Sequence, residues 1–355
     1  MITVLKNFYH KYLSDPQAAI LAILIVAGFS IIILMGNMLL PVFASIVIAY
    51  LLDDLVVKLK RSGLRRRYGV WVAYLLFLAA LIILLFGVIP LLTTQITALV
   101  RELPQMIASG QKALENIPQN YPVISEQQLA ESMRSLQQQI TGFGQRLVAF
   151  SLHRIPGLIT FTVYLVLMPL LVFFFLKDKW QILIWGNRFL PEERELMNKV
   201  WTEMDLQLGN YVRGKVWEAL IVGVVSGATF TFMGMNYSIL LGVAIGLSVI
   251  IPYIGAVVVT IPVLLIAYFQ WGLSAEFVYA MIAYGVIQTL DGVVLVPLLF
   301  SEAVNIHPVA IIVSVLLFGG LWGFWGVFFA IPLATFVRAL ITAWPATQTD
   351  SVASS

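Results

Sequence analysis

The sequence predicts an all-α polytopic membrane protein with about eight hydrophobic helical elements, two of them broken or re-entrant, plus an extracytoplasmic helical hairpin. Hydrophobic residues make up 60% of the 355 positions, more than a soluble globular domain of this length carries. Several apolar runs approach or exceed the roughly 20 residues needed to cross a bilayer. The absence of cysteine excludes disulfides, thiolate metal sites and cysteine nucleophiles.

Residues 1–92 are expected to form N-terminal membrane helices. A first span covers about 18–35, where a Gly-Asn pair is expected to break it, and a second covers about 38–52. Six basic residues then fall in one short loop: Lys58, Lys60, Arg61, Arg65, Arg66 and Arg67. Because short basic loops stay in the cytoplasm, they predict a cytoplasmic N-terminus. A third span, about 69–92, leads outward.

Residues 93–155 are predicted to form an extracytoplasmic amphipathic helical hairpin. From Leu129 to Phe150, apolar residues recur at alternating steps of four and three, a heptad seam that requires a partner helix. The partner is either the helix over 93–117 or a second copy in an oligomer. A membrane helix over 156–176 follows, and then a cytoplasmic amphipathic linker over 177–215, which contains both basic and acidic residues.

The segment 216–340 is predicted to be a transport core built from two similar units, followed by a disordered tail over 341–355. In each unit an apolar helix precedes an apolar segment of about 30 residues that is interrupted in its middle. The interruptions fall at Pro252 and Gly255 and at the Gly-Trp array over 319–326. Paired broken segments are typical of transporter binding sites. Each is either a re-entrant hairpin or a single kinked helix.

Asp291 is the main candidate for function, because it lies inside a mostly apolar run. A carboxylate in hydrocarbon costs a few kcal/mol and by default marks the path of an ion or a polar solute. Gln288 lies one turn before it. A buried ion pair, or a hydrogen bond to unwound backbone, is the structural alternative.

The other candidate substrate- or ion-binding residues are less specific. Pro252 and Gly255 would free backbone groups that a solute could satisfy. The further candidates in this class are Tyr253, Asn305, His307, Arg213 and Glu218, and the candidate gate or hairpin glycines are Gly319, Gly320, Gly323 and Gly326. A lone histidine more often caps or turns a helix than binds a metal, so no metal site is predicted.

Six segments together resemble the autoinducer-2 exporter (AI-2E) family of permeases. They are NYVRGK at 210–215, IPYIGA at 251–256, LDG at 290–292, LVP at 295–297, NIHP at 305–308 and FGGLWGFWGVFFAIPLA at 318–334. The resemblance covers nearly the whole chain. It implies a transport protein of the bacterial inner membrane and a homo-oligomer, with a pentamer as one option. It fixes neither cargo nor direction.

The sequence therefore predicts a secondary transporter, a permease or exporter, that moves a small polar solute across the inner membrane and is driven by a proton or sodium gradient. The chain contains no P-loop, no H-E-x-x-H and no G-x-S-x-G, so neither an enzyme nor a cofactor is expected. The net charge of +3 is too small to indicate nucleic-acid binding. The expected partners are the lipid bilayer, the solute and further copies of the chain. The alternatives are a non-transporting scaffold for envelope proteins and a passive channel.

Overall fold

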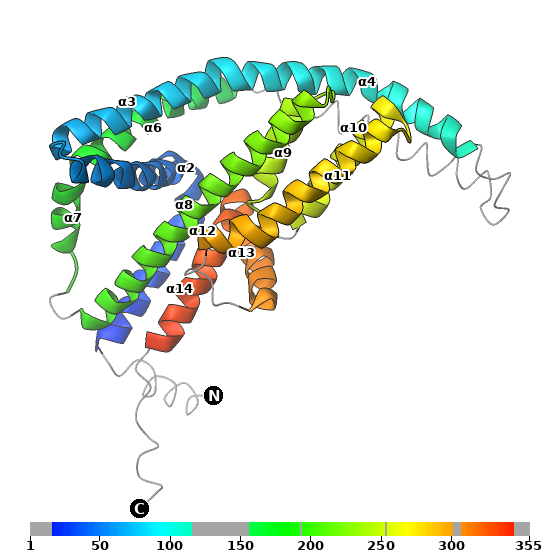
Figure 1. Ribbon diagram of the computed structural model, residues 1–355. Helices are drawn as coiled ribbons and strands as arrows, with labels where there is room; N and C mark the ends of the chain where they lie inside the picture. Colours follow the sequence, from blue (N-terminus) through cyan, green and yellow to red (C-terminus); the bar gives the residue numbers. More distant parts are fainter. Residues whose placement is uncertain (1–15, 116–155, 192–193, 253, 301–306, 344–355) are drawn as a thin grey trace, which may run out of the picture. The chain divides into compact units, whose positions relative to one another are not determined.

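The computed structural model describes residues 16–115, 156–191, 194–252, 254–300 and 307–343 (Figure 1). Within these ranges every regular element is helical. The helices are α2 (Pro16–Arg61), α3 (Arg66–Ile83), α4 (Ile89–Glu115), α6 (Pro156–Lys177), α7 (Lys179–Asn187), α8 (Glu195–Phe232), α9 (Ser238–Ser248), α10 (Ile254–Trp271), α11 (Ala275–Leu290), α12 (Val296–Phe300), α13 (Pro308–Phe328) and α14 (Ala330–Ala343), with π-helical turns η1 (Leu84–Val88) and η2 (Asp291–Leu295). The all-α fold is confirmed.

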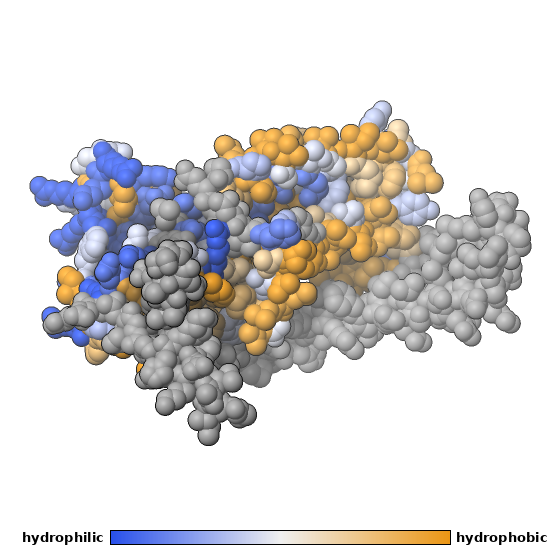
Figure 2. Space-filling model, turned by 90° about the horizontal axis from the view of Figure 1, so that it is seen from below, coloured by the Kyte–Doolittle hydropathy of each residue, from blue (hydrophilic) through white to orange (hydrophobic). Residues whose placement is uncertain are grey.

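Six of the described helical segments are long and apolar enough to cross a membrane, and four shorter helices are apolar as well. Figure 2 shows broad hydrophobic areas on the face of the molecule that it presents. Apolar side chains that would be unfavourable in water are favourable against lipid. The chain is therefore a multi-pass helical membrane protein.

The chain divides into two compact units, each assembled from separate stretches. Unit 1 contains residues 1–75, 167–217 and 296–355, and unit 2 contains residues 76–166 and 218–295. The helical hairpin α13–α14 belongs to unit 1, and the helical hairpin α9–α10 belongs to unit 2. Each unit therefore contains one of the two broken segments that the sequence predicts.

Two expected boundaries are wrong. The Gly-Asn pair after residue 35 does not end a helix, because α2 runs unbroken over 46 residues. Nor does a helix start near 216, since α8 continues from Glu195 to Phe232. A glycine inside a helix costs about 1 kcal/mol, whereas backbone groups left unpaired in hydrocarbon cost several each. Continuing the helix is therefore the cheaper solution.

Each of the two π-helical turns is followed by a proline. Pro90 follows η1, and Pro297 follows η2, each two residues after the turn ends. Proline cannot donate to the carbonyl four residues earlier, and its ring collides with that carbonyl. At η1 the Ile89 N–H bonds to the carbonyl of Leu84, five residues back. A π-turn inside a membrane helix often marks a functional position, and η2 begins at Asp291.

The core of unit 2 lies between α8, α9, α10 and α11. It includes Val222, Phe230, Ile245, Val263 and Tyr284, all less than one tenth exposed. Helices α8 and α9 approach at their glycines: a Cβ on Gly242 would lie 2.6 Å from the Cα of Gly227 and 2.8 Å from the Gly223 carbonyl oxygen. The two Gly-x-x-x-Gly pairs thus bring two backbones into contact.

Helix α4 packs on this core and contacts the turn between α8 and α9. The Gln95 side chain accepts a hydrogen bond from the Leu240 N–H at 2.8 Å, which satisfies one of the donors left open at the start of α9. Tyr237, at the N-cap of α9, has a left-handed backbone with φ of 58°. Burial raises the pKa of Tyr237, and its hydrogen bond to Glu102 raises that pKa further. The predicted 93–155 hairpin is described only up to Glu115.

Candidate functional site

A polar contact fixes α10 against α11 inside the apolar core of unit 2. The hydroxyl of Tyr284 lies 2.8 Å from that of Thr260 and 3.3 Å from the carbonyl oxygen of Ala256. The Thr260 hydroxyl also donates to the Ala256 carbonyl at 2.7 Å. Tyr284 is only 5% exposed, and the ring of Phe230 lies beside it at 6.5 Å. Burying these hydroxyls is acceptable because they bond one another.

The same face of α11 continues towards two predicted site residues. Tyr284, Gln288 and Asp291 are four and three residues apart, a spacing that puts side chains on one side of a helix. The Nε2 atom of Gln288 is buried and has no hydrogen-bond partner among the described residues. An unpaired buried amide costs about 1–3 kcal/mol. Native proteins rarely keep such a group without a use for it, and binding a solute is one such use.

The pairing of α10 with α11 indicates which residues of α11 lie level with the break that follows α9. Because α10 and α11 are antiparallel neighbours joined by a short turn, advancing along α11 corresponds to moving back along α10. Tyr284 lies opposite Ala256 and Thr260, and Gln288 is about 6 Å further on. From this register we infer that Gln288 is level with the start of α10 and Asp291 with the break at 249–252.

The break itself depends on Gly255. A Cβ at this position would collide with the carbonyl oxygen of Ser248, the last residue of α9. The turn is held by local backbone bonds: Ile251 donates to the Ser248 carbonyl at 3.0 Å, and Gly255 to the Ile251 carbonyl at 2.9 Å. Pro252 lies between the two helices. The predicted interruption at Pro252 and Gly255 is confirmed, whereas Tyr253 lies outside the described residues.

The second predicted interruption lies in unit 1. Gly323 has a φ of 60° and a ψ of −134°, so α13 is kinked there. A Cβ on Gly326 would collide with the Phe318 carbonyl oxygen, and one on Gly319 would meet the side chain of Val327 at 2.8 Å. A Cβ on Gly320 would meet nothing within 4 Å. The break within 319–326 is therefore confirmed, with Gly323 and Gly326 as its structural residues.

His307 is exposed and is the N-cap of α13, where its Nδ1 atom accepts a hydrogen bond from the Val309 N–H at 3.3 Å. This is the capping role that sequence reasoning gave as the commoner alternative. Asn305 lies outside the described residues. Glu218, in unit 2, is only 2% exposed, as expected of a carboxylate that belongs to a membrane helix and faces the protein interior.

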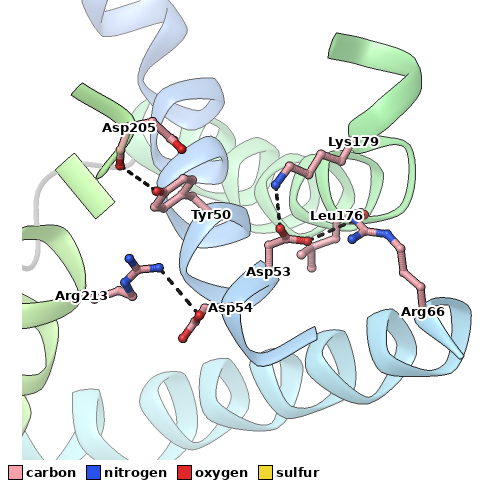
Figure 3. A network of polar contacts seen from close by, with 8 residues as sticks. All are labelled: Tyr50, Asp53, Asp54, Arg66, Leu176, Lys179, Asp205 and Arg213. Carbon is pink, nitrogen blue, oxygen red and sulfur yellow. Dashed lines mark hydrogen bonds and ion pairs between the residues drawn. The ribbon is translucent and has the colours of Figure 1, made fainter. Parts of the chain in front are cut away.

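Arg213 makes its side-chain contacts with residues of unit 1. Its guanidinium lies 3.8 Å from a carboxylate oxygen of Asp54, donates to the Asn210 side chain at 3.0 Å and lies 5.8 Å from the ring centre of Tyr50. The Tyr50 hydroxyl donates to the Asp205 carbonyl at 3.0 Å (Figure 3). Arg213 therefore connects α8 to α2, a structural role that its sequence context did not show.

Asp53 is a buried, paired carboxylate that sequence reasoning missed. One carboxylate oxygen lies 2.7 Å from the Lys179 amine, and the other lies 3.1 Å from the Arg66 guanidinium (Figure 3). Arg66 also donates to the Leu176 carbonyl at 3.1 Å. Asp53 is 8% exposed, so both cations are needed to offset its desolvation. The available signal was an Asp-Asp pair at the end of an apolar run, directly before the basic loop.

Phe300 accounts for part of the 210–215 motif. Its ring packs on Gly214, where a Cβ would lie 2.6 Å from the ring edge. The ring of Tyr211 lies 5.9 Å away, and the Lys215 amine lies 5.2 Å from the ring centre. A residue larger than glycine at 214 would displace the ring, so this part of the motif positions α12 on α8.

The whole chain has recognisable relatives. The model of the AI-2E family transporter matches residues 20–346. "Putative permease PerM" of Escherichia coli (strain K12) is 45% identical over 349 residues, which cover 97% of this chain and 98% of the relative. "Putative transport protein YueF" of Bacillus subtilis (strain 168) is 27% identical over 306 residues, covering 82% and 80%. "Putative transport protein YrrI" of the same strain is 26% identical over 307 residues, covering 85% of each.

The family match spans the kinked helices, the polar face of α11 and the network around Arg213, and the names of these relatives all describe permeases or transport proteins. The resemblance inferred from the sequence motifs is thus confirmed. This chain belongs to the AI-2E transporter family.

Proposed function

We propose that this protein is a secondary transporter, not an enzyme, that carries a small polar solute across the bacterial inner membrane in exchange with, or together with, protons or sodium ions. Membership of the AI-2E family supports transport in general. The cargo class and the coupling rest on the polar face of α11 in unit 2. The basic loop over 58–67 supports a cytoplasmic N-terminus.

The proposal is supported by two polar side chains, Gln288 and Asp291, which we infer from the helix register to lie level with the break between α9 and α10. Gln288 has a buried Nε2 atom without a partner among the described residues, and Asp291 begins a π-turn three residues later. The α9–α10 backbone is interrupted between Ser248 and Ile254, which the inferred register aligns with these two residues. Groups that are polar, buried and next to a backbone break can exchange their partners for a solute with little cost.

The proposal gives each residue a role. Asp291 exchanges the proton or cation that couples transport. Gln288 donates to an oxygen of the solute, and the backbone around Pro252 and Gly255 completes the site and moves as a gate. Glu218 lies on the ion path. Arg213 holds α8 against α2 while the gate moves.

Transport by the purified protein in proteoliposomes tests the assignment. Because the cargo is unknown, the probe is the gradient itself: proton or sodium flux is followed with a trapped pH- or sodium-sensitive dye. Asp291→Asn should reduce this flux to the level of empty vesicles, since the amide cannot exchange a proton or attract a cation. Gln288→Met is a second variant, expected to keep the fold and to lower the same proton or sodium flux.

Glu276→Gln is the matched control, because Glu276 is an exposed acid in the first turn of the same helix. It should leave flux unchanged. Normal flux in a well-folded Asp291→Asn protein defeats the site assignment. A passive channel would give conductance without any dependence on proton or sodium gradients. A scaffold would give no flux in any variant and would lose its envelope partners in pull-downs when 93–155 is deleted.

A further inference from the structure

Unit 1 contains a cavity of 720 Å³ between α2, α8, α13 and α14. The side chains lining it are all hydrophobic, and many are aromatic, among them Phe29, Phe43, Trp322, Trp325 and Phe336. Its volume lies within the roughly 300–1,000 Å³ of small-molecule sites. It lies on α2 and the α13–α14 hairpin, whereas the proposed transport site belongs to unit 2.

Water is a poor occupant for this cavity. A buried water needs two to four polar partners, and cavities of about 150 Å³ with apolar walls already stay dry and accept apolar guests. Apart from the indole N–H groups of Trp322 and Trp325, the side chains that line the larger cavity offer no hydrogen-bonding group. Two isolated donors do not give a water its two to four partners, so the walls favour a hydrocarbon occupant.

The cavity opens towards lipid. Leu34 and Met38, at its edge, are 82% and 74% exposed. The parts of α2 and α13 that form the walls are apolar enough to lie in a membrane. The medium outside such side chains is the acyl-chain region of the bilayer, so a lipid chain is the occupant available at the highest concentration.

The chain's own ends are less suitable occupants. To reach Phe29 on α2, the segment before Pro16 would have to fold back over 13 residues of helix, about 20 Å, carrying Lys6, Lys11 and Asp15 into hydrocarbon. Such charges are costly there. The segment after Ala343 is mostly polar and contains Asp350.

We propose that this cavity is a binding site for one acyl chain of a bilayer phospholipid, seated against the kink of α13. Leu321 and Trp322 precede Gly323, and Trp325 follows it; all three line the cavity. Trp322 stacks on Phe318 at 5.7 Å and contacts Phe29 at 5.4 Å. The bound chain fills the space beside these rings and supports the kinked hairpin.

Photocrosslinking of the full-length protein in phosphatidylethanolamine vesicles tests the proposal. The probe is phosphatidylethanolamine with a diazirine in one acyl chain, and the labelled peptides are mapped by mass spectrometry. We expect concentrated labelling of the peptide around Leu321–Trp325. Unlabelled phosphatidylethanolamine should compete, whereas glycerophosphoethanolamine, which has the headgroup but no acyl chains, should not.

Two cavity-filling variants come from opposite walls, Leu40→Trp on α2 and Leu333→Trp on α14. Each should lower this labelling about tenfold, equivalent to a tenfold loss of affinity. Val26→Trp is the control, because Val26 is exposed on α2 but does not line the cavity. The competition experiment uses the wild-type protein, so it still tests the proposal if either filling variant misfolds.

Three results would overturn the proposal. Labelling spread evenly over all lipid-facing helices, insensitive to the filling variants, would mean ordinary annular lipid. Labelling that occurs only after residues 1–15 are removed would make that segment the occupant. Crosslinks between α2 of one copy and α13 of another, with no lipid label, would make the cavity an interface between copies.

Discussion

The helical hairpins α9–α10 and α13–α14 use the same backbone device in different chemical surroundings. In each, one glycine lies so close to a backbone carbonyl before the break that a Cβ would collide with it: Gly255 of α10 against Ser248 of α9, and Gly326 against Phe318 across the kink within α13. The first hairpin has a tyrosine–threonine contact and the polar face of α11 beside it. The second has stacked aromatic rings and an apolar cavity.

This difference indicates that the residues that interrupt a helix are not the residues that determine what the interruption can bind. Both hairpins contain a close glycine contact, so that contact does not determine what the break can bind. The neighbouring helix decides which groups meet at the turn: α11 contributes hydroxyl, amide and carboxylate groups, whereas α2 contributes Phe29 and other apolar side chains. Of the two, only the surroundings of the α9–α10 hairpin suit an ion or a polar solute.

The largest expected effect comes from filling the two close contacts. Gly255→Ala and Gly326→Ala each push a Cβ into a backbone carbonyl, which cannot rotate away, so each should cost at least the roughly 1–3 kcal/mol typical of overpacking. Thermal unfolding in detergent and the yield of monodisperse protein measure this. Gly320→Ala, with open space around its Cβ, is the control and should be neutral. A Gly255→Ala protein as stable as the wild type would contradict the expectation that both hairpins depend on a close glycine contact.

A smaller loss of stability is expected from substituting Gly323, whose backbone conformation has no counterpart at Gly255. Its φ of 60° with ψ of −134° is strained for any residue with a Cβ, so Gly323→Ala should cost about 1–3 kcal/mol. Gly255 has no such positive φ. Gly323→Asn should cost less, since asparagine tolerates positive φ better than alanine. Equal stability of wild type and both variants would show that the kink is not fixed by this residue.

The smallest effect concerns the polar contact beside the first hairpin. Tyr284→Phe removes a hydroxyl that bonds Thr260 and Ala256, and should cost roughly 0.5–1.5 kcal/mol. A double-mutant cycle with Thr260→Val isolates the pair, because each single variant removes the same bond. Tyr279→Phe, an exposed tyrosine on α11, serves as control. Strictly additive losses would mean that this contact does not fix the register.

Sequence reasoning located both interruptions because glycine and proline are poor helix formers, and a long apolar run that contains several of them rarely stays one straight helix. The break predicted at the Gly-Asn pair is wrong, because α2 continues through it. A helix tolerates such residues where the tertiary structure requires no change of chain direction. Sequence reasoning also missed Asp53, because the value of that carboxylate depends on Arg66 and Lys179, which come from α3 and α7. Tyr284 was missed for a similar reason: its partner is 24 residues earlier.

Composition and spacing alone determined that this chain is a helical membrane protein with two broken segments and an acid within an apolar run. Those properties follow from local chemistry, namely hydrocarbon solvation and the backbone limits of proline and glycine. Which break has polar neighbours and which has an apolar cavity was decided only by tertiary packing. Helix register, helix pairing and the distance between a carboxylate and its cations depend on contacts between residues far apart in the chain, and no local pattern encodes them.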